Sequence, residues 1–157
     1  MDLELTPLER AVLEKLFAGE HPVLAALRTQ LEASKVARRE LTGVGFFVDF
    51  TVPRTVPPAP VGERLSFGDV HAELEGLAHG AGFLAFVEEG YLTLLEGFSY
   101  DEPWPASTDR FLLRYEQDPR EPAALGSRPE GRPVRPRGST SAGSRSPAGP
   151  RCPGRRR

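Results

Sequence analysis

Residues 83–98, FLAFVEEGYLTLLEGF, decide the fold of this chain. Two apolar runs, 83–87 and 91–98, flank the pair Glu89 and Gly90, and a glycine after a polar residue is typical of a tight β-hairpin turn. Both faces of the first run are largely apolar, which predicts a strand in the middle of a sheet. The sequence therefore predicts a central antiparallel hairpin.

Other strand patterns lie on both sides of this hairpin. The clearest is 44–52, in which every second residue is Val or Phe, as in a strand with one buried face. Segments 36–41, 67–75 and 111–115 carry weaker strand patterns. Several prolines exclude regular structure from 53–64, which we expect to be a surface loop.

The N-terminal residues have the pattern of helices instead. Thr6, Pro7 and Glu9 have the spacing of a helix start with a capping box, and Gly19 is a suitable stop. Pro22 opens a second apolar stripe. Helices followed by hairpin-linked strands favour an α+β fold, with an N-terminal helical hairpin packed on an antiparallel sheet of about five to six strands.

Charge and aromatic content divide the chain near residue 118. All nine Phe, three Tyr and the single Trp occur at or before Tyr115. Residues 1–120 hold 20 acidic and 11 basic residues, whereas residues 121–157 hold 2 acidic residues and 9 Arg. We therefore predict an acidic domain over 1–118 and a disordered basic Arg/Pro/Gly/Ser tail over 119–157. The tail is either a genuine basic arm or the frameshifted end of a GC-rich gene.

Composition excludes several classes of function. An acidic domain disfavours nucleic-acid binding, which needs clustered Lys and Arg, so nucleic acid is an expected partner only if the tail is genuine. The single cysteine, Cys152, cannot form an internal disulfide. No signal peptide or membrane span is apparent, which favours the cytoplasm. Ile and Asn are absent and Lys occurs twice, which indicates a GC-rich bacterial gene. No motif implies a cofactor.

Three phrases of the sequence resemble a family of small uncharacterised bacterial proteins. They are GVGFFVDF at 43–50, GAGFLAFVEEG at 80–90 and LEGFSYDEPW at 95–104. The resemblance covers roughly 36–115 and excludes the tail. It implies a stand-alone cytosolic domain, and it transfers no activity and no site residues.

One alternating segment suggests a metal site. On a strand, Asp69, His71, Glu73 and Glu75 share one face with neighbours about 6.6 Å apart, and His79 follows in the next turn. Imidazole and carboxylate groups that converge can hold a cation. The competing interpretation is the solvated face of a strand whose other residues point inward.

The segment 98–105 is the best candidate for a binding surface. It contains Tyr100, Asp101, Glu102 and Trp104, and protein interfaces favour Tyr and Trp. The acidic residues would select a basic partner. The alternative is that Trp104 packs back on the domain and closes its core.

These observations support two hypotheses for function. The first is a non-catalytic protein-interaction module, immunity-like or regulatory, that binds another protein through the sheet and the 98–105 loop. The alternative is a small metal- or ligand-binding enzyme that uses the His71 and Glu73 strand face. Glu88 and Glu89 could do acid–base work but also fit a charged hairpin end. An exposed edge strand would allow dimerisation.

Overall fold

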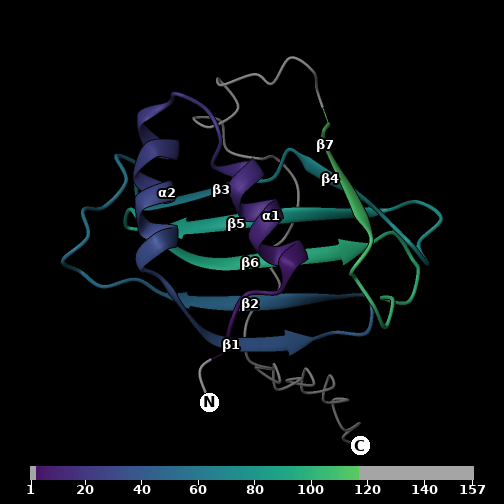
Figure 1. The fold of residues 1–157 in the computed structure, drawn as a ribbon. Coiled ribbons are helices and arrows are strands. Elements are labelled where there is room, and N and C mark those ends of the chain that lie inside the picture. Colours follow the sequence, from purple (N-terminus) through teal and green to yellow (C-terminus); the bar gives the residue numbers. More distant parts are fainter. Residues whose placement is uncertain (1–2, 117–157) are drawn as a thin grey trace, which may run out of the picture.

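Two helices precede seven strands in the computed structural model of the protein, which describes residues 3–116 (Figure 1). The α+β prediction is confirmed, with one strand more than the expected range. The predicted tail at 119–157 lies outside the described residues. The elements are α1 Pro7–Leu16, α2 Pro22–Ala33, β1 Lys35–Leu41, β2 Gly45–Thr51, β3 Arg64–Phe67, β4 Val70–Leu74, β5 Ala81–Glu88, β6 Tyr91–Ser99 and β7 Phe111–Tyr115.

The predicted start of α1 is confirmed in detail. The Thr6 hydroxyl accepts a hydrogen bond from the Glu9 backbone N–H at 3.2 Å, and the Glu9 carboxylate accepts one from the Thr6 N–H at 2.9 Å. Both bonds satisfy N–H groups that have no partner inside the helix. Gly19 lies in the following turn with φ of 124°. Neither described helix is long and apolar enough to cross a membrane.

The sheet is antiparallel, and its strands run in the order β1, β2, β6, β5, β4, β7, with β3 also paired to β5. The hairpin of β5 and β6 is central, as predicted. Glu89 and Gly90 both have positive φ, 51° and 86°, as a tight turn matched to the strand twist requires. The other strands of the sheet therefore lie on both sides of this hairpin.

The segment predicted as one strand over 67–75 is instead divided between β3 and β4. The break falls at Gly68, where a Cβ atom would overlap the carbonyl group of Phe83. This close approach of two backbones requires glycine. β3 pairs with the second half of β5, whereas β4 pairs with β5 only at Ala81 and Gly82 and then with β7.

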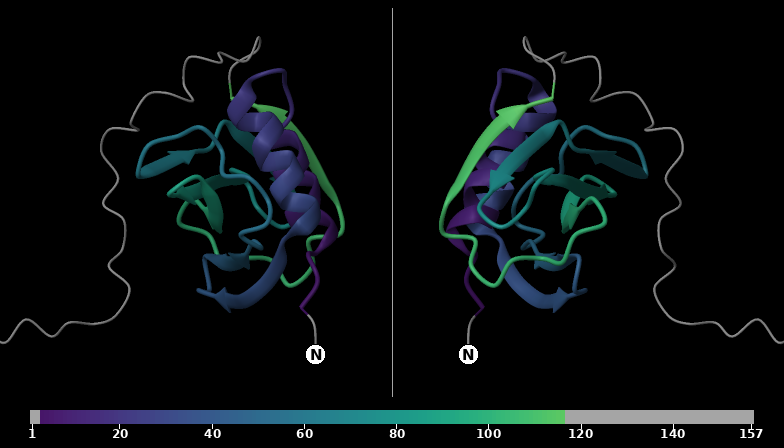
Figure 2. Two further views of the ribbon diagram at one scale, coloured as in Figure 1. Left: turned by 90° about the vertical axis from the view of Figure 1, so that its left-hand side faces the viewer. Right: turned by 90° about the vertical axis from the view of Figure 1, so that its right-hand side faces the viewer.

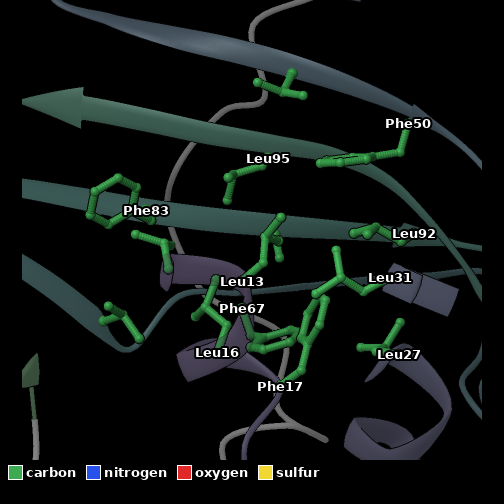
Figure 3. Packing of buried hydrophobic residues seen from close by; sticks show 14 of the residues in the cluster. Leu13, Leu16, Phe17, Leu27, Leu31, Phe50, Phe67, Phe83, Leu92 and Leu95 are labelled. Carbon is green, nitrogen blue, oxygen red and sulfur yellow. The ribbon is translucent and has the colours of Figure 1, made fainter. Parts of the chain in front are cut away.

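Both helices cover the same face of the sheet (Figures 1 and 2). We call this the inner face. Side chains from the helices and from the central strands point toward one another there (Figure 3). Phe17 and Phe83 are among the largest fully buried side chains. Burial of this apolar surface supplies the main driving force for folding.

Buried polar side chains of both helices are bonded to the sheet and its turns. Gln30 of α2 is fully buried, donates to the Gly90 carbonyl at 2.7 Å and accepts from the Leu92 N–H at 2.9 Å. Glu9 of α1 receives two hydrogen bonds from the Arg39 guanidinium, at 2.9 and 2.7 Å. Fixed partners of this kind are needed wherever polar groups are buried.

The proline-rich segment is a loop, as predicted, but part of it belongs to the core. Ala59 is 3% exposed, and its N–H donates to the Gly90 carbonyl at 2.7 Å. The Tyr91 hydroxyl donates to the Val56 carbonyl at 3.0 Å. The loop therefore closes the turn end of the central hairpin.

Candidate interaction surface on the outer face of the sheet

The outer face is the sheet face opposite the helices, and the strand register defines its residues. Val48 of β2 pairs with Leu95 of β6, which pairs with Ala85 of β5, and all three are fully buried on the inner face. Because side chains alternate along a strand, the adjacent rows point outward. One outer row joins Phe47, Glu96 and Leu84, and the other joins Asp49, Leu94 and Phe86.

Large apolar side chains occupy the centre of this outer face. They are half-buried, whereas their inner-face neighbours along the same strands are fully buried. Within residues 3–116, both helices lie on the other side of the sheet. The outer apolar residues of the three central strands are Phe47, Leu84, Phe86, Leu94 and Phe98, which we call the outer cluster.

The charges among these strands are of one sign. β2, β5 and β6 contain Asp49, Glu88 and Glu96 and no Lys or Arg. Asp49 and Glu96 are half-buried and lie in adjacent outer rows. Basic residues of the sheet occur on the flanking strands, among them Arg38, the cross-strand neighbour of Asp49. The centre of the outer face thus combines aromatic rings with carboxylates.

Tyr100 extends the outer cluster toward β4. Its ring stacks on His71 with centroids 6.4 Å apart and planes at 18°, and it meets Phe98 edge-on at 5.7 Å. Gly82 leaves space for the Phe98 ring, because a Cβ atom at position 82 would lie 2.6 Å from that ring. One of the predicted partner-binding residues therefore joins the outer face.

Trp104 lies on a different side of the same loop. Its backbone N–H donates to the Gly43 carbonyl at 2.8 Å, and the centroid of its ring lies 5.4 Å from that of Phe46 in an edge-on contact. The side chain is half-buried and packs against the hydrophobic core. We predicted that Trp104 and Tyr100 belong to one binding surface, but their rings do not form one patch.

Glu102 and Asp101 have local roles in the loop. The Glu102 carboxylate accepts hydrogen bonds from the Ala78 and His79 N–H groups, at 2.8 and 3.1 Å. These bonds favour the charged form and hold the pKa of Glu102 below its usual value, with a smaller contribution from the His79 charge. Asp101 adopts a left-handed backbone with φ of 61°.

The residues of the predicted metal site are dispersed. His71 lies under the Tyr100 ring, and Glu75 forms an exposed ion pair with Arg110 at 3.7 Å. Glu73 is exposed on β4, and His79 lies in the turn held by Glu102. In residues 3–116, no group of three or more His, Cys, Asp or Glu side chains is placed to hold a metal ion. The metal site stays a prediction.

Comparison of the chain with protein-family models, curated proteins and solved structures gave no match. The candidate surface is therefore argued from its own geometry. Sequence reasoning missed Phe47, Leu84, Phe86 and Leu94 as surface residues. The signal was present in the apolar character of both faces of 83–87, which we interpreted only as a sign of a central strand.

Proposed function

We propose that this protein is a non-catalytic interaction module whose outer sheet face binds another protein, in a regulatory or immunity-like role. The observation that carries the proposal is the outer cluster, five large apolar side chains that stay half-buried on three adjacent strands. Partly exposed apolar side chains that gather on the sheet face opposite the helices are a common basis for protein–protein binding.

Charge and ring chemistry indicate the kind of partner. Asp49 and Glu96 place carboxylates among Phe rings. An Arg side chain can bind to carboxylates and to aromatic rings at once, because its guanidinium pairs with the first and stacks on the second. The described part as a whole is acidic, which favours encounter with a basic protein. The proposed partner is therefore a protein that presents Arg together with apolar groups.

Affinity capture with matched variants tests this proposal. The tagged full chain is used as bait in a lysate of its source organism, beside Leu94→Gln on the outer face and Leu41→Gln as control. Leu41 is 72% exposed at the end of β1 and pairs with Phe46 on the inner side. We expect one protein to be captured by the wild type and by Leu41→Gln, and lost with Leu94→Gln.

Circular dichroism of each bait establishes that it is folded before capture. If a folded Leu94→Gln bait captures the same proteins as the wild type, the outer face is not the binding surface and the proposal is wrong. Isothermal titration with the captured protein then compares the dissociation constants of the two variants directly.

A further inference from the structure

The described chain ends at one side of the outer face. β7 is the edge strand next to β4, and Arg114 is the cross-strand neighbour of His71. The Glu116 N–H donates to the Asp69 carbonyl at 2.8 Å. His71 in turn stacks under Tyr100, which contacts Phe98 of the outer cluster. The described chain therefore ends beside the candidate surface.

Residues 119–157 have a charge opposite to that of the outer face. Residues 119–157 contain ten Arg, two Glu, no Lys and no aromatic residue. The described residues 3–116 carry 18 acidic and 10 basic residues, a net charge of −8. The three central strands add only acidic charges to the outer face. The two parts of the chain are thus complementary in charge.

We propose that residues 119–157 bind in cis to the outer face of their own sheet, with Arg side chains stacked on the outer cluster and paired with Asp49 and Glu96. The segment would then compete with a basic partner for this surface. The inference rests on the proposed function in that both assign binding to the same face. It makes the Arg-rich segment an internal regulator of access.

Length and local concentration favour this contact. Four strand steps separate β7 from β2, and each is about 4.8 Å, so the distance is roughly 20 Å. Roughly six extended residues span it, far fewer than the chain supplies. A tethered segment also has an effective concentration of about 1 mM for a short flexible linker, so individually weak Arg contacts suffice.

The single cysteine allows a direct test on the intact chain. A nitroxide spin label is attached to Cys152, the only cysteine, and amide signals of the ¹⁵N-labelled protein are compared before and after reduction of the nitroxide. We expect signal loss at Asp49, Leu94 and Glu96, and little loss in α1, which lies behind the sheet. Raising salt from about 0.1 M to about 1 M shortens the Debye length from about 10 Å to about 3 Å and should restore the signals.

Charge variants sharpen this test. The pair Asp49→Asn and Glu96→Gln, made in the full chain, should reduce the signal loss. The control pair Glu14→Gln and Glu32→Gln removes two exposed helix charges and should leave it unchanged. The proposal is overturned if signals are lost equally in α1 and on the outer face, or if the loss is confined to the end of β7.

A mixing experiment separates this chain's own segment from a second copy. Spin-labelled chains without ¹⁵N are mixed with unlabelled ¹⁵N chains, and signal loss at the outer face in this mixture would mean binding in trans and would overturn the cis proposal. The two proposals can fail separately. If the spin label causes no signal loss at the outer face but Leu94→Gln still fails to capture the partner, the cis proposal is wrong and the proposed function stands. If signals are lost at the outer face but Leu94→Gln captures the same proteins as the wild type, the proposed function is wrong and the cis contact stands.

Discussion

The two faces of the central sheet are built from alternate residues of the same strands, but they have different roles. On the inner face, Phe83 and Leu95 are almost fully buried beneath the helices. On the outer face, Leu94, next to Leu95, and Phe86, three residues after Phe83, stay half-buried. An apolar pattern along a strand therefore does not establish how each of its faces is covered.

The two faces should also differ in whether replacing their residues changes the stability of the domain or its binding to a partner. Inner-face residues have their contacts within the domain, so their replacement should lower the free energy of unfolding. Outer-face residues retain exposed apolar area, so their replacement should change association more than folding. The first of four predictions tests this contrast directly, and the other three concern contacts that hold the helices and the 98–105 loop on the sheet.

The largest expected effect is that of Phe83→Ala. Phe83 is 1% exposed, and its truncation leaves a cavity that should lower the free energy of unfolding by about 3–5 kcal/mol. Phe86→Ala, three residues along the same strand, should cost only about 1–2 kcal/mol, because less apolar area is buried. Urea denaturation measures both. Equal losses would mean that the outer face is as much a part of the core as the inner face.

The next effect concerns the bond between α2 and the central hairpin. Gln30→Leu keeps the side-chain bulk but leaves the buried Leu92 N–H without its acceptor, which should cost about 1–3 kcal/mol. The control is Glu32→Ala, an exposed change on the same helix, expected to stay within about 0.5 kcal/mol. A Gln30→Leu variant as stable as the wild type would argue against this hydrogen bond.

Within the 98–105 loop, Trp104 and Tyr100 should behave differently. Trp104→Ala removes a half-buried ring that packs on Phe46 and should cost about 2 kcal/mol. Tyr100→Ala, at 37% exposure, should cost less than about 1 kcal/mol while it weakens partner binding. Thermal unfolding and titration with the captured partner measure the two effects. A reversed order would assign the core role to Tyr100.

The smallest effect is the pH dependence that Glu102 contributes. Its pKa is lowered in the folded state by the Ala78 and His79 N–H groups, so its stabilisation is present above the ordinary value of 4.5 and disappears as pH falls through the lower folded pKa. Glu102→Gln should therefore be less stable than the wild type at neutral pH, and the difference should shrink toward acidic pH. A difference that grows on acidification would contradict this sign.

Local sequence signals predicted the order of the elements well. The Thr6 capping box, the Glu89 turn and the alternation over 44–52 each depend on neighbours in the chain, and all three appear where predicted. The division of 67–75 could not be foreseen, because it arises from the approach of Gly68 to Phe83, residues 15 positions apart. Contacts between distant segments leave little trace in local periodicity.

The candidate site was predictable only in part. Tyr100 is an exposed aromatic residue of the 98–105 loop. Trp104 was grouped with it through proximity in sequence, whereas their rings lie against different parts of the sheet. The outer cluster was missed, since its members come from three strands and are brought together by register.

The sequence by itself determined the α+β class, the central hairpin and the contrast in charge between the two parts of the chain, because these follow from periodicity, turn chemistry and composition. Tertiary structure alone decided which face of the central hairpin the helices cover, where Gly68 divides a strand, and that Asp49 and Glu96 lie among Phe rings. The physical reason is that burial is a property of packed layers. Two faces that both carry large apolar side chains differ in burial only once the helices dock on one of them.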